Sequence, residues 1–207
     1  MYVVCVTRNK SIAVTTLHSL MTLGMHSSHK SVQVEYVFVE GLDALTKLVK
    51  TGERIVWFDY GTNLDQDSIP RLLSPMEKDI RVVVFPSVVE GVDWDMFRRK
   101  TVAGSTEPIH QRALNFDTNV TKKVVGTDLY DVEQTSARVW VMDSKPIDKK
   151  LKSTQKNLSC ESYEKLFAQL KSLSIRVVAL PSATVIRHFT HKCLGNILEM
   201  PGVMTNP

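Results

Sequence analysis

A run of apolar residues that stops at a single carboxylate constrains the fold of this chain most. Residues 55–58 are all apolar, and Asp59 follows them directly, with the loop-forming Gly61 and Asn63 close behind. Such a run predicts a strand buried on both faces, as in a parallel sheet covered by helices. An unpaired ionised carboxylate is too costly to bury, so we expect Asp59 to face a cleft or to hold a cation. The carboxyl end of a strand is also where open α/β sheets bind their ligands.

Strand and helix patterns alternate through the first half of the chain. The helix expected over residues 12–23 should end at Gly24, with a loop over 26–30, and Pro70 lies in the first turn of a helix that begins at Ser68. This order predicts an α/β fold built on a parallel, doubly wound sheet. The strands are expected at residues 2–6, 32–39, 55–58 and 81–85, and the intervening helices at 12–23, 42–49 and from 68 onward.

The second half of the chain is less regular. Residues 90–117 are polar, and Asp93 is expected to cap a helix that follows it. The lysine-rich residues 145–160 predict a surface loop. We expect one domain over residues 1–200, divided at about residue 90, with residues 201–207 as a tail or a linker to further domains. The other elements are expected as strands around 139–142, at 176–180 and at 184–189, and as a helix over 163–173.

Composition and charge narrow the class of ligand. The chain has 207 residues and a formal net charge of +4, which is too small to indicate nucleic acid as a partner but suits an anionic small molecule such as a nucleotide. Neither a Gly-x-Gly-x-x-Gly nor a P-loop motif follows any expected strand. The three cysteines lack metal-ligand spacing and indicate free thiols in a reducing compartment, and no apolar run is long enough for a transmembrane segment. We therefore expect a cytoplasmic protein.

The first strand ends in a short polar sequence directly before a helix. Thr7, Arg8 and Asn9 follow the apolar residues 2–6. An arginine beside a helix amino terminus can bind an anion or the edge of a nucleobase. The alternative is that Asn9 or Ser11 only caps the helix, which would explain Asn9 but not Arg8.

A second polar cluster follows the last expected strand. His188 and His191 are three residues apart, with Lys192 next to them. Neutral imidazole is a ligand for manganese or zinc, and a lysine there could neutralise a phosphate. In an extended segment the two histidines point to opposite faces, so only one reaches a given site. The alternative is that both are ordinary surface or core residues.

A third cluster precedes the strand expected around residues 139–142. It combines carboxylates with small hydroxylated residues, and another carboxylate, Asp143, follows the strand. Such a set suits a sugar pocket, or equally a solvated edge hairpin, and the spacing alone does not separate the two. The cluster consists of Asp128, Asp131, Glu133, Thr135, Ser136 and Ala137.

These pieces together resemble GT-A type glycosyltransferases. The resemblance rests on the strand followed by Thr7, Arg8 and Asn9, on the apolar strand that ends at Asp59, and on the late histidines, and it covers nearly the whole chain. Residues 57–63 and 188–196 are most similar to the amino-terminal domain of chlorella-virus-encoded glycosyltransferases. The family implies a single Rossmann-like domain with a central, mostly parallel sheet flanked by helices. Residues 1–90 would bind the nucleotide, and residues 91–200 the sugar and the acceptor.

The resemblance also implies the chemistry. In the family, an Asp-x-Asp motif at a strand end holds Mn²⁺ (or Mg²⁺), which bridges the diphosphate of a nucleotide sugar. Gly61 replaces the second acid here, so Asp59 would need help from Asn63, Asp65 or water. The implied metal ligands are Asp59, His188 and His191; the nucleotide-binding residues are Thr7, Arg8, Asn9, Asp59, Tyr60, Gly61 and Lys192; the donor-sugar residues are Thr135, Ser136 and Ala137; and the candidate catalytic bases are Asp143, Glu133 and Asp131.

Three functions remain open at this point. The first is a metal-dependent hexosyltransferase that moves a sugar from a UDP-sugar to a glycan acceptor, which the viral resemblance places on a capsid protein in the host cytoplasm. The second is a sugar-phosphate nucleotidyltransferase, although the Gly-rich loop of such enzymes is absent after the first strand. The third is a non-catalytic module that binds glycan or protein on a decayed transferase fold, which the loss of the second acid at Gly61 would favour.

Overall fold

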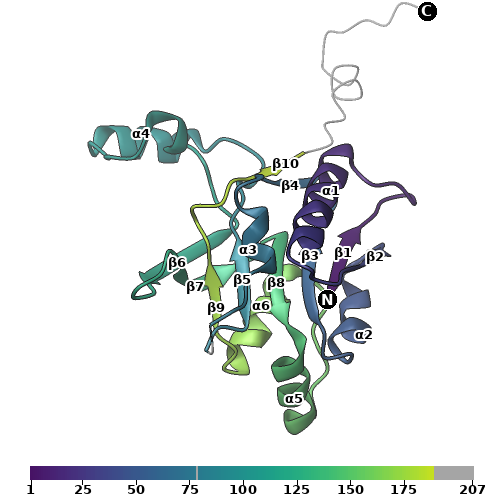
Figure 1. The fold of residues 1–207 in the computed structure, drawn as a ribbon. Coiled ribbons are helices and arrows are strands. Elements are labelled where there is room, and N and C mark those ends of the chain that lie inside the picture. Colours follow the sequence, from purple (N-terminus) through teal and green to yellow (C-terminus); the bar gives the residue numbers. More distant parts are fainter. Residues whose placement is uncertain (78, 189–207) are drawn as a thin grey trace, which may run out of the picture.

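A computed structural model describes residues 1–77 and 79–188 and places an eight-stranded mixed sheet between two layers of helices (Figure 1). The strands are β1 (Tyr2–Val6), β2 (Glu35–Val39), β3 (Arg54–Phe58), β4 (Thr62–Leu64), β5 (Val82–Phe85), β6 (Thr118–Lys123), β7 (Tyr130–Thr135), β8 (Val139–Asp143), β9 (Val177–Ala179) and β10 (Val185–Arg187). The α-helices are α1 (Val14–His29), α2 (Leu45–Val49), α3 (Ile69–Leu73), α4 (Trp94–Val102), α5 (Ser144–Thr154) and α6 (Tyr163–Ser172), and 3-10 turns cover Leu42–Ala44 and Ile109–Gln111.

The direction of the strands confirms an α/β sheet but not a purely parallel one. The order across the sheet is β2-β1-β3-β8-β5-β9-β7-β6. The pairs β1–β2, β1–β3 and β5–β9 are parallel, whereas β8 runs antiparallel to both of its neighbours, β3 and β5. At the far edge, β7 and β6 add antiparallel pairs. Because β8 is reversed, its first residue lies at the edge of the sheet where β3 and β5 end.

Helices cover both faces of the sheet, which explains the continuous apolar runs in its central strands. On one face, α1 and α3 pack on the side chains of Cys5, Val56 and Phe58. On the other face, α2, α5 and α6 pack on alternate residues, among them Trp57 and Trp140. All five of these sheet residues are fully buried.

Two sequence predictions in these layers are wrong. Helix α1 does not end at Gly24 but continues to His29, and the hydroxyl groups of Ser27 and Ser28 donate to the Gly24 carbonyl oxygen. The segment predicted as a surface loop at 145–160 instead begins with α5, which buries Ile147 and Leu151 four residues apart. The many lysines of this segment hid a narrow apolar stripe.

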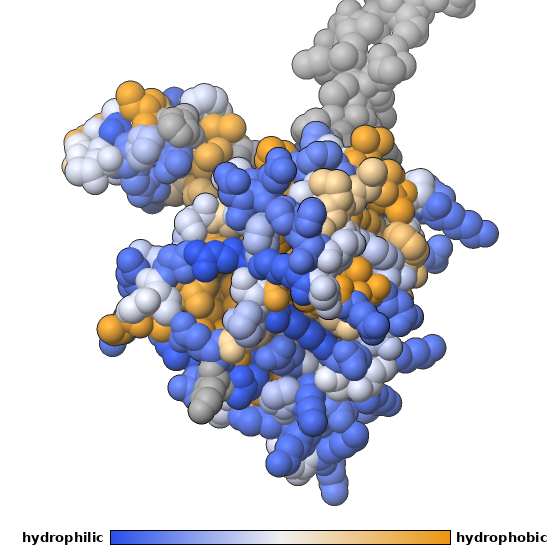
Figure 2. Space-filling view, in the orientation of Figure 1, coloured by the Kyte–Doolittle hydropathy of each residue, from blue (hydrophilic) through white to orange (hydrophobic). Residues whose placement is uncertain are grey.

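The connection between β5 and β6 projects from the sheet and carries α4 (Figure 1). Asp93 caps this helix as predicted, since its Oδ1 accepts a hydrogen bond of 2.7 Å from the Met96 N–H. No residue of α4 is buried, and Trp94 is 65% exposed. Figure 2 shows apolar surface on this projection. Over the described residues, none of the helices has the length and apolarity to cross a membrane.

Candidate functional site

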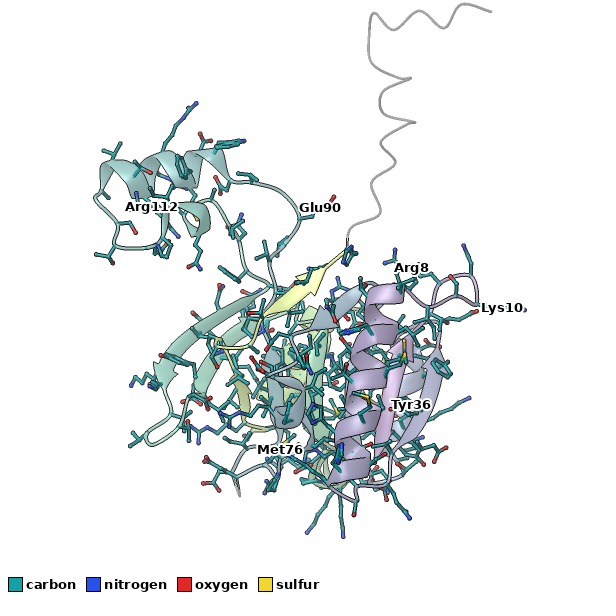
Figure 3. All side chains as sticks on the ribbon, turned by 45° about the horizontal axis from the view of Figure 1, so that its top comes forward. Arg8, Lys10, Tyr36, Met76, Glu90 and Arg112 are labelled. Atoms are coloured by element: carbon teal, nitrogen blue, oxygen red, sulfur yellow. The ribbon has the colours of Figure 1, made fainter. Side chains whose placement is uncertain are left out.

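The direction in which the chain moves across the sheet reverses between β1 and β3. The chain leaves β1 toward β2 on one side, and after β3 it moves toward β5 on the other side. Ligands of open α/β sheets bind at such a reversal, outside the carboxyl ends of the strands. Arg8 follows β1 and Tyr60 follows β3, and the Arg8 guanidinium carbon lies 4.9 Å from the centre of the Tyr60 ring. Figure 3 shows Arg8 at this edge of the molecule. The structure therefore places two of the residues predicted to bind a nucleotide next to each other.

Asp59 is buried at this edge, and it is held by an arginine. Its Oδ2 atom lies 2.9 Å from Nη1 of Arg138, the residue directly before β8. Its Oδ1 atom accepts a hydrogen bond of 2.8 Å from the Tyr60 N–H, and its own N–H donates to the Arg138 carbonyl oxygen. The sequence predicted that Asp59 faces a cleft or holds a cation. The cation is the guanidinium of Arg138.

Aromatic side chains support Arg138 from below. Its guanidinium carbon lies 4.4 Å from the centre of the Tyr163 ring, at the start of α6. The Tyr163 hydroxyl in turn accepts a hydrogen bond of 3.0 Å from Trp57 Nε1. Burial raises the pKa of Tyr163 well above its ordinary value, and the negative charge of Asp59 raises it further. Tyr163 therefore stays neutral and does not compete with Asp59 for the charge of the Arg138 guanidinium.

A second arginine shares the electrostatic field of this edge. Arg187 ends β10 and is half-buried. Burial lowers its pKa, and repulsion from Arg138 lowers it further, whereas Asp117, Asp59 and Glu90 raise it. The two arginines therefore share this edge with the acidic side chains of Asp59, Asp117 and Glu90.

Gly61 allows the last described segment to approach Asp59. The His188 N–H donates a hydrogen bond of 2.7 Å to the Gly61 carbonyl oxygen, and β10 pairs with β4 just beyond this contact. Gly61 has φ of +74°, and a Cβ atom there would lie 2.9 Å from the His188 carbonyl oxygen. The glycine at position 61 is thus required by the close approach of the backbone.

The residues described do not form a metal site by themselves. Across residues 1–77 and 79–188, no three His, Cys, Asp or Glu side chains are grouped so that they could hold an ion. Both oxygens of Asp59 already have partners. Asn63 accepts a hydrogen bond of 2.5 Å from Ser19, and Asp65 accepts from the N–H groups of Ser68 and Thr184. His188 is exposed, and His191 and Lys192 lie outside the described residues. The donor set around Asp59 fits an anion better than a metal ion.

The predicted donor-sugar residues lie beside a buried network of hydroxyl groups. Thr135 Oγ1 is 2.7 Å from Thr118 Oγ1, and the Asp117 carboxylate accepts hydrogen bonds from Thr118 and from the N–H and hydroxyl of Ser87. Ala137 is fully buried and serves packing. A polar pocket of about 210 Å³ opens above the network. It is lined by Val89, Phe116, Asp117, Asn119, Gln134, Thr135, Ser136 and Glu164.

The three candidate bases are not gathered around Asp59. Asp143 faces Arg54 in the register of β8 against β3, so it lies at the opposite end of β3 from Asp59, about 16 Å away at the usual rise of a strand. Asp131 binds Arg176 with both carboxylate oxygens, at 2.9 and 3.2 Å. Glu133 is exposed, and its carbonyl oxygen accepts a hydrogen bond from Lys171. Asp143 lies far from Asp59 because β8 runs antiparallel to β3.

The segment after β1 is a tight turn and not a helix cap. Arg8 and Ser11 exchange backbone hydrogen bonds of 3.1 and 2.9 Å, and Asn9 and Lys10 have φ of 50° and 58°. Asparagine tolerates this left-handed conformation better than most residues. Thr7 is buried, and its hydroxyl donates to the Val39 carbonyl oxygen of β2. Neither Asn9 nor Ser11 caps α1, whose first turn lacks a side-chain cap.

Sequence reasoning missed Arg138 and Asp117. Arg138 directly precedes the apolar residues 139–142, just as Asp59 directly follows the apolar residues 55–58. If these two strands are paired antiparallel, an arginine and an aspartate at such positions meet. The signal was therefore present, but it required knowledge that β8 runs against β3.

Comparisons with known proteins give little further information. No protein-family model and no curated protein matches the sequence. Among solved structures, the fold is similar to the crystal structure of A197 from STIV, with a TM-score of 0.47 and 8% sequence identity over 91% of this chain and 85% of that one. Such a distant similarity assigns no residue a role, so the chemistry of this chain rests on its own side chains.

Proposed function

We propose that this chain is a glycosyltransferase of the hexosyltransferase type, which moves a sugar from a nucleoside-diphosphate sugar, with UDP-sugar as the expected donor, to a glycan acceptor. The observation that carries the proposal is the ion pair of 2.9 Å between Asp59 and Arg138 at the reversal of strand order, next to Arg187. The sequence resemblance to GT-A type enzymes gives the reaction class. The site supports it because the Arg138 guanidinium, held in place by Asp59, and Arg187 lie where a diphosphate would bind.

The arginines would stabilise the leaving group. When the bond between the sugar and the diphosphate breaks, negative charge grows on the departing nucleotide, and hydrogen-bond donors that are already in place lower the barrier. Asp59 and the ring of Tyr163 hold the Arg138 guanidinium in position. Arginine is suited to this role because its planar group binds two phosphate oxygens at once.

The nucleobase would lie against the Arg8–Tyr60 pair. A guanidinium stacked on an aromatic ring gives a flat surface with a positive edge, which suits a pyrimidine and its carbonyl oxygens. The position of the pair beyond β1 and β3 agrees with the nucleotide-binding role that the resemblance gives to Arg8 and Tyr60. The polar pocket beside Ser136 would then offer hydroxyl and amide groups to a sugar.

A divalent cation remains a separate part of the proposal. Mn²⁺ or Mg²⁺ would have to displace Arg138 from Asp59 or use ligands outside the described residues, such as His191. In the proposed arrangement, Arg138 and Arg187 neutralise most of the diphosphate charge instead. We therefore expect UDP to bind in the presence of a chelator and Mn²⁺ to tighten binding only modestly.

Calorimetric titration separates these possibilities. UDP, GDP and CMP are titrated in EDTA and then in Mn²⁺, and hydrolysis of UDP-sugars is followed in parallel. The proposal predicts that UDP binds most tightly and that a UDP-sugar is turned over. Binding of none of the three nucleotides would contradict it. Binding without turnover would favour the non-catalytic module, and release of pyrophosphate from a nucleoside triphosphate and a sugar phosphate would favour the nucleotidyltransferase.

A further inference from the structure

A sizeable cavity lies away from the proposed nucleotide site. It has a volume of about 560 Å³, within the range of small-molecule sites, and we call it the amino-edge pocket because it includes Arg54, the first residue of β3. Met76, which lines it, lies at the opposite end of the molecule from Arg8 (Figure 3). The pocket is therefore separate from the residues around Asp59 and Arg138. Its lining includes Arg54, Arg71, Met76, Ile80, Val83 and Leu129.

Arg54 supplies a positive charge that the fold leaves incompletely satisfied. Burial lowers its pKa, and the charge of Asp143 on the neighbouring strand only partly opposes this. Its Nε atom is buried and has no hydrogen-bond partner in the described part of the chain. A buried polar group without a partner costs about 1–3 kcal/mol. A carboxylate that accepts hydrogen bonds from the terminal guanidinium nitrogens would instead stabilise the charge that burial disfavours.

The other charges of the pocket limit the ligand to a single negative charge. Arg71 is already paired with Asp128 at 2.8 Å, and Glu77 adds another carboxylate to the lining. A ligand with two or more negative charges would be repelled by these acids, whereas one carboxylate would match the one incompletely satisfied guanidinium.

The remaining wall of the pocket is apolar. Ile80 is buried, Met76 and Val83 are partly buried, and all three pack in one small cluster with Leu129. Most ligand pockets combine such a wall with a few polar groups that fix the orientation of the ligand. A carboxylate attached to an apolar body would match both the guanidinium and the apolar wall of the pocket.

We propose that the amino-edge pocket binds a small organic carboxylate, with the carboxylate on Arg54 and an apolar or aromatic body against Met76, Ile80 and Val83. The inference does not depend on the proposed glycosyltransferase function, because the two sites share no residue. The pocket would give the protein a second ligand, and this ligand would be distinct in charge from a nucleotide diphosphate.

The test uses 3-phenylpropionate as the probe, with 3-phenylpropanol as its neutral analogue and phenyl phosphate as its dianionic one. Binding to the full chain is followed by ligand-observed NMR. We expect 3-phenylpropionate to bind at millimolar concentration and more tightly than either analogue, and an excess of UDP to leave it bound. Tighter binding of phenyl phosphate, or displacement of the carboxylate by UDP, would overturn the proposal.

Variants locate the binding. Arg54→Gln should weaken the binding of 3-phenylpropionate about tenfold or more, because it removes one charge-assisted hydrogen-bonded pair. Arg98→Gln is the matched control, because it removes the same charge from a side chain that is 80% exposed on α4. Met76→Glu provides a second test at a half-buried position that leaves Arg54 in place, and its added charge should also abolish binding. Unchanged affinity in folded Arg54→Gln or Met76→Glu protein would contradict the assignment, as would absence of binding to the wild type.

Discussion

Trp57 and Trp140 stack face to face on the neighbouring strands β3 and β8, with ring centroids 5.2 Å apart and planes within 6° of parallel. The two side chains are fully buried, but only Trp57 uses its N–H, which donates to the Tyr163 hydroxyl. Trp140 Nε1 has no partner within the part of the chain that the structure describes. Trp57 of this stack positions Tyr163 through their hydrogen bond, and the Tyr163 ring in turn contacts the Arg138 guanidinium.

The stack makes a matched pair of substitutions possible. Trp57→Phe and Trp140→Phe remove similar volumes from the same core, but only Trp57→Phe leaves the Tyr163 hydroxyl without its donor. We expect Trp57→Phe to lower the free energy of unfolding by about 1 kcal/mol more than Trp140→Phe does, the usual net value of one buried hydrogen bond. Urea denaturation followed by circular dichroism measures both. An equal loss in the two variants would show that the Trp57–Tyr163 bond contributes nothing to stability.

The close approach at Gly61 can be separated from its backbone conformation. Gly61 and Gly104 both have positive φ, +74° and +67°, but only at Gly61 would a Cβ atom meet another backbone atom, at 2.9 Å. We expect Gly104→Ala to cost about 1 kcal/mol, which is the left-handed strain alone. Gly61→Ala should cost about 3 kcal/mol or more, because His188 must also move. Thermal or urea unfolding of the two variants gives the comparison, and equal losses would mean that the contact with His188 is not tight in solution.

Cys5 gives the stability of the protein a dependence on alkaline pH. Burial, together with the smaller effect of the Asp59 charge, raises its pKa from 9.0 to about 11. Between these values the unfolded thiol loses its proton while the folded thiol keeps it, so the unfolded state binds fewer protons and stability falls as pH rises from about 9 to 11. Tyr163, whose pKa is also raised by burial, acts in the same direction.

The contribution of Cys5 is isolated by Cys5→Ala. The packing loss of this variant is independent of pH, so it lowers stability by a constant amount, while the slope between pH 9 and 11 should become shallower than in the wild type. Urea midpoints at intervals of one pH unit give both slopes. A slope that is unchanged in Cys5→Ala would mean that the thiol is not the group that titrates.

Local patterns in the sequence were sufficient for β1, β3 and β5, whereas β4 and β6 were not predicted. The apolar runs at β1, β3 and β5 are short and continuous, and such runs report burial on both faces without any knowledge of the tertiary structure. The prediction that Asp59 faces a cleft or holds a cation also followed from local physics, because an isolated charge is costly to bury in any fold.

The partner itself could not be predicted locally. Arg138 lies 79 residues from Asp59 in the sequence, and the two meet only because β8 runs antiparallel between β3 and β5. The same reversal moved Asp143 to the far end of the sheet, where Arg54 lies. The direction of a strand is set by its long-range pairing, which neither apolar periodicity nor spacing contains. The helix α5 was not predicted for a different reason, since its two buried apolar residues are outnumbered by lysines.

The most direct test of the account is the affinity of UDP for wild-type, Arg138→Gln and Arg98→Gln protein, measured by calorimetric titration in EDTA. Both substitutions lower the net charge by one, but only Arg138 lies on Asp59 at the end of β3. The account predicts that Arg138→Gln weakens UDP by about tenfold to a hundredfold, as expected for one charge-assisted pair, and that Arg98→Gln binds like the wild type. Equal affinity of all three proteins, with their folds intact, would contradict the claim that the Asp59–Arg138 edge holds a nucleotide diphosphate.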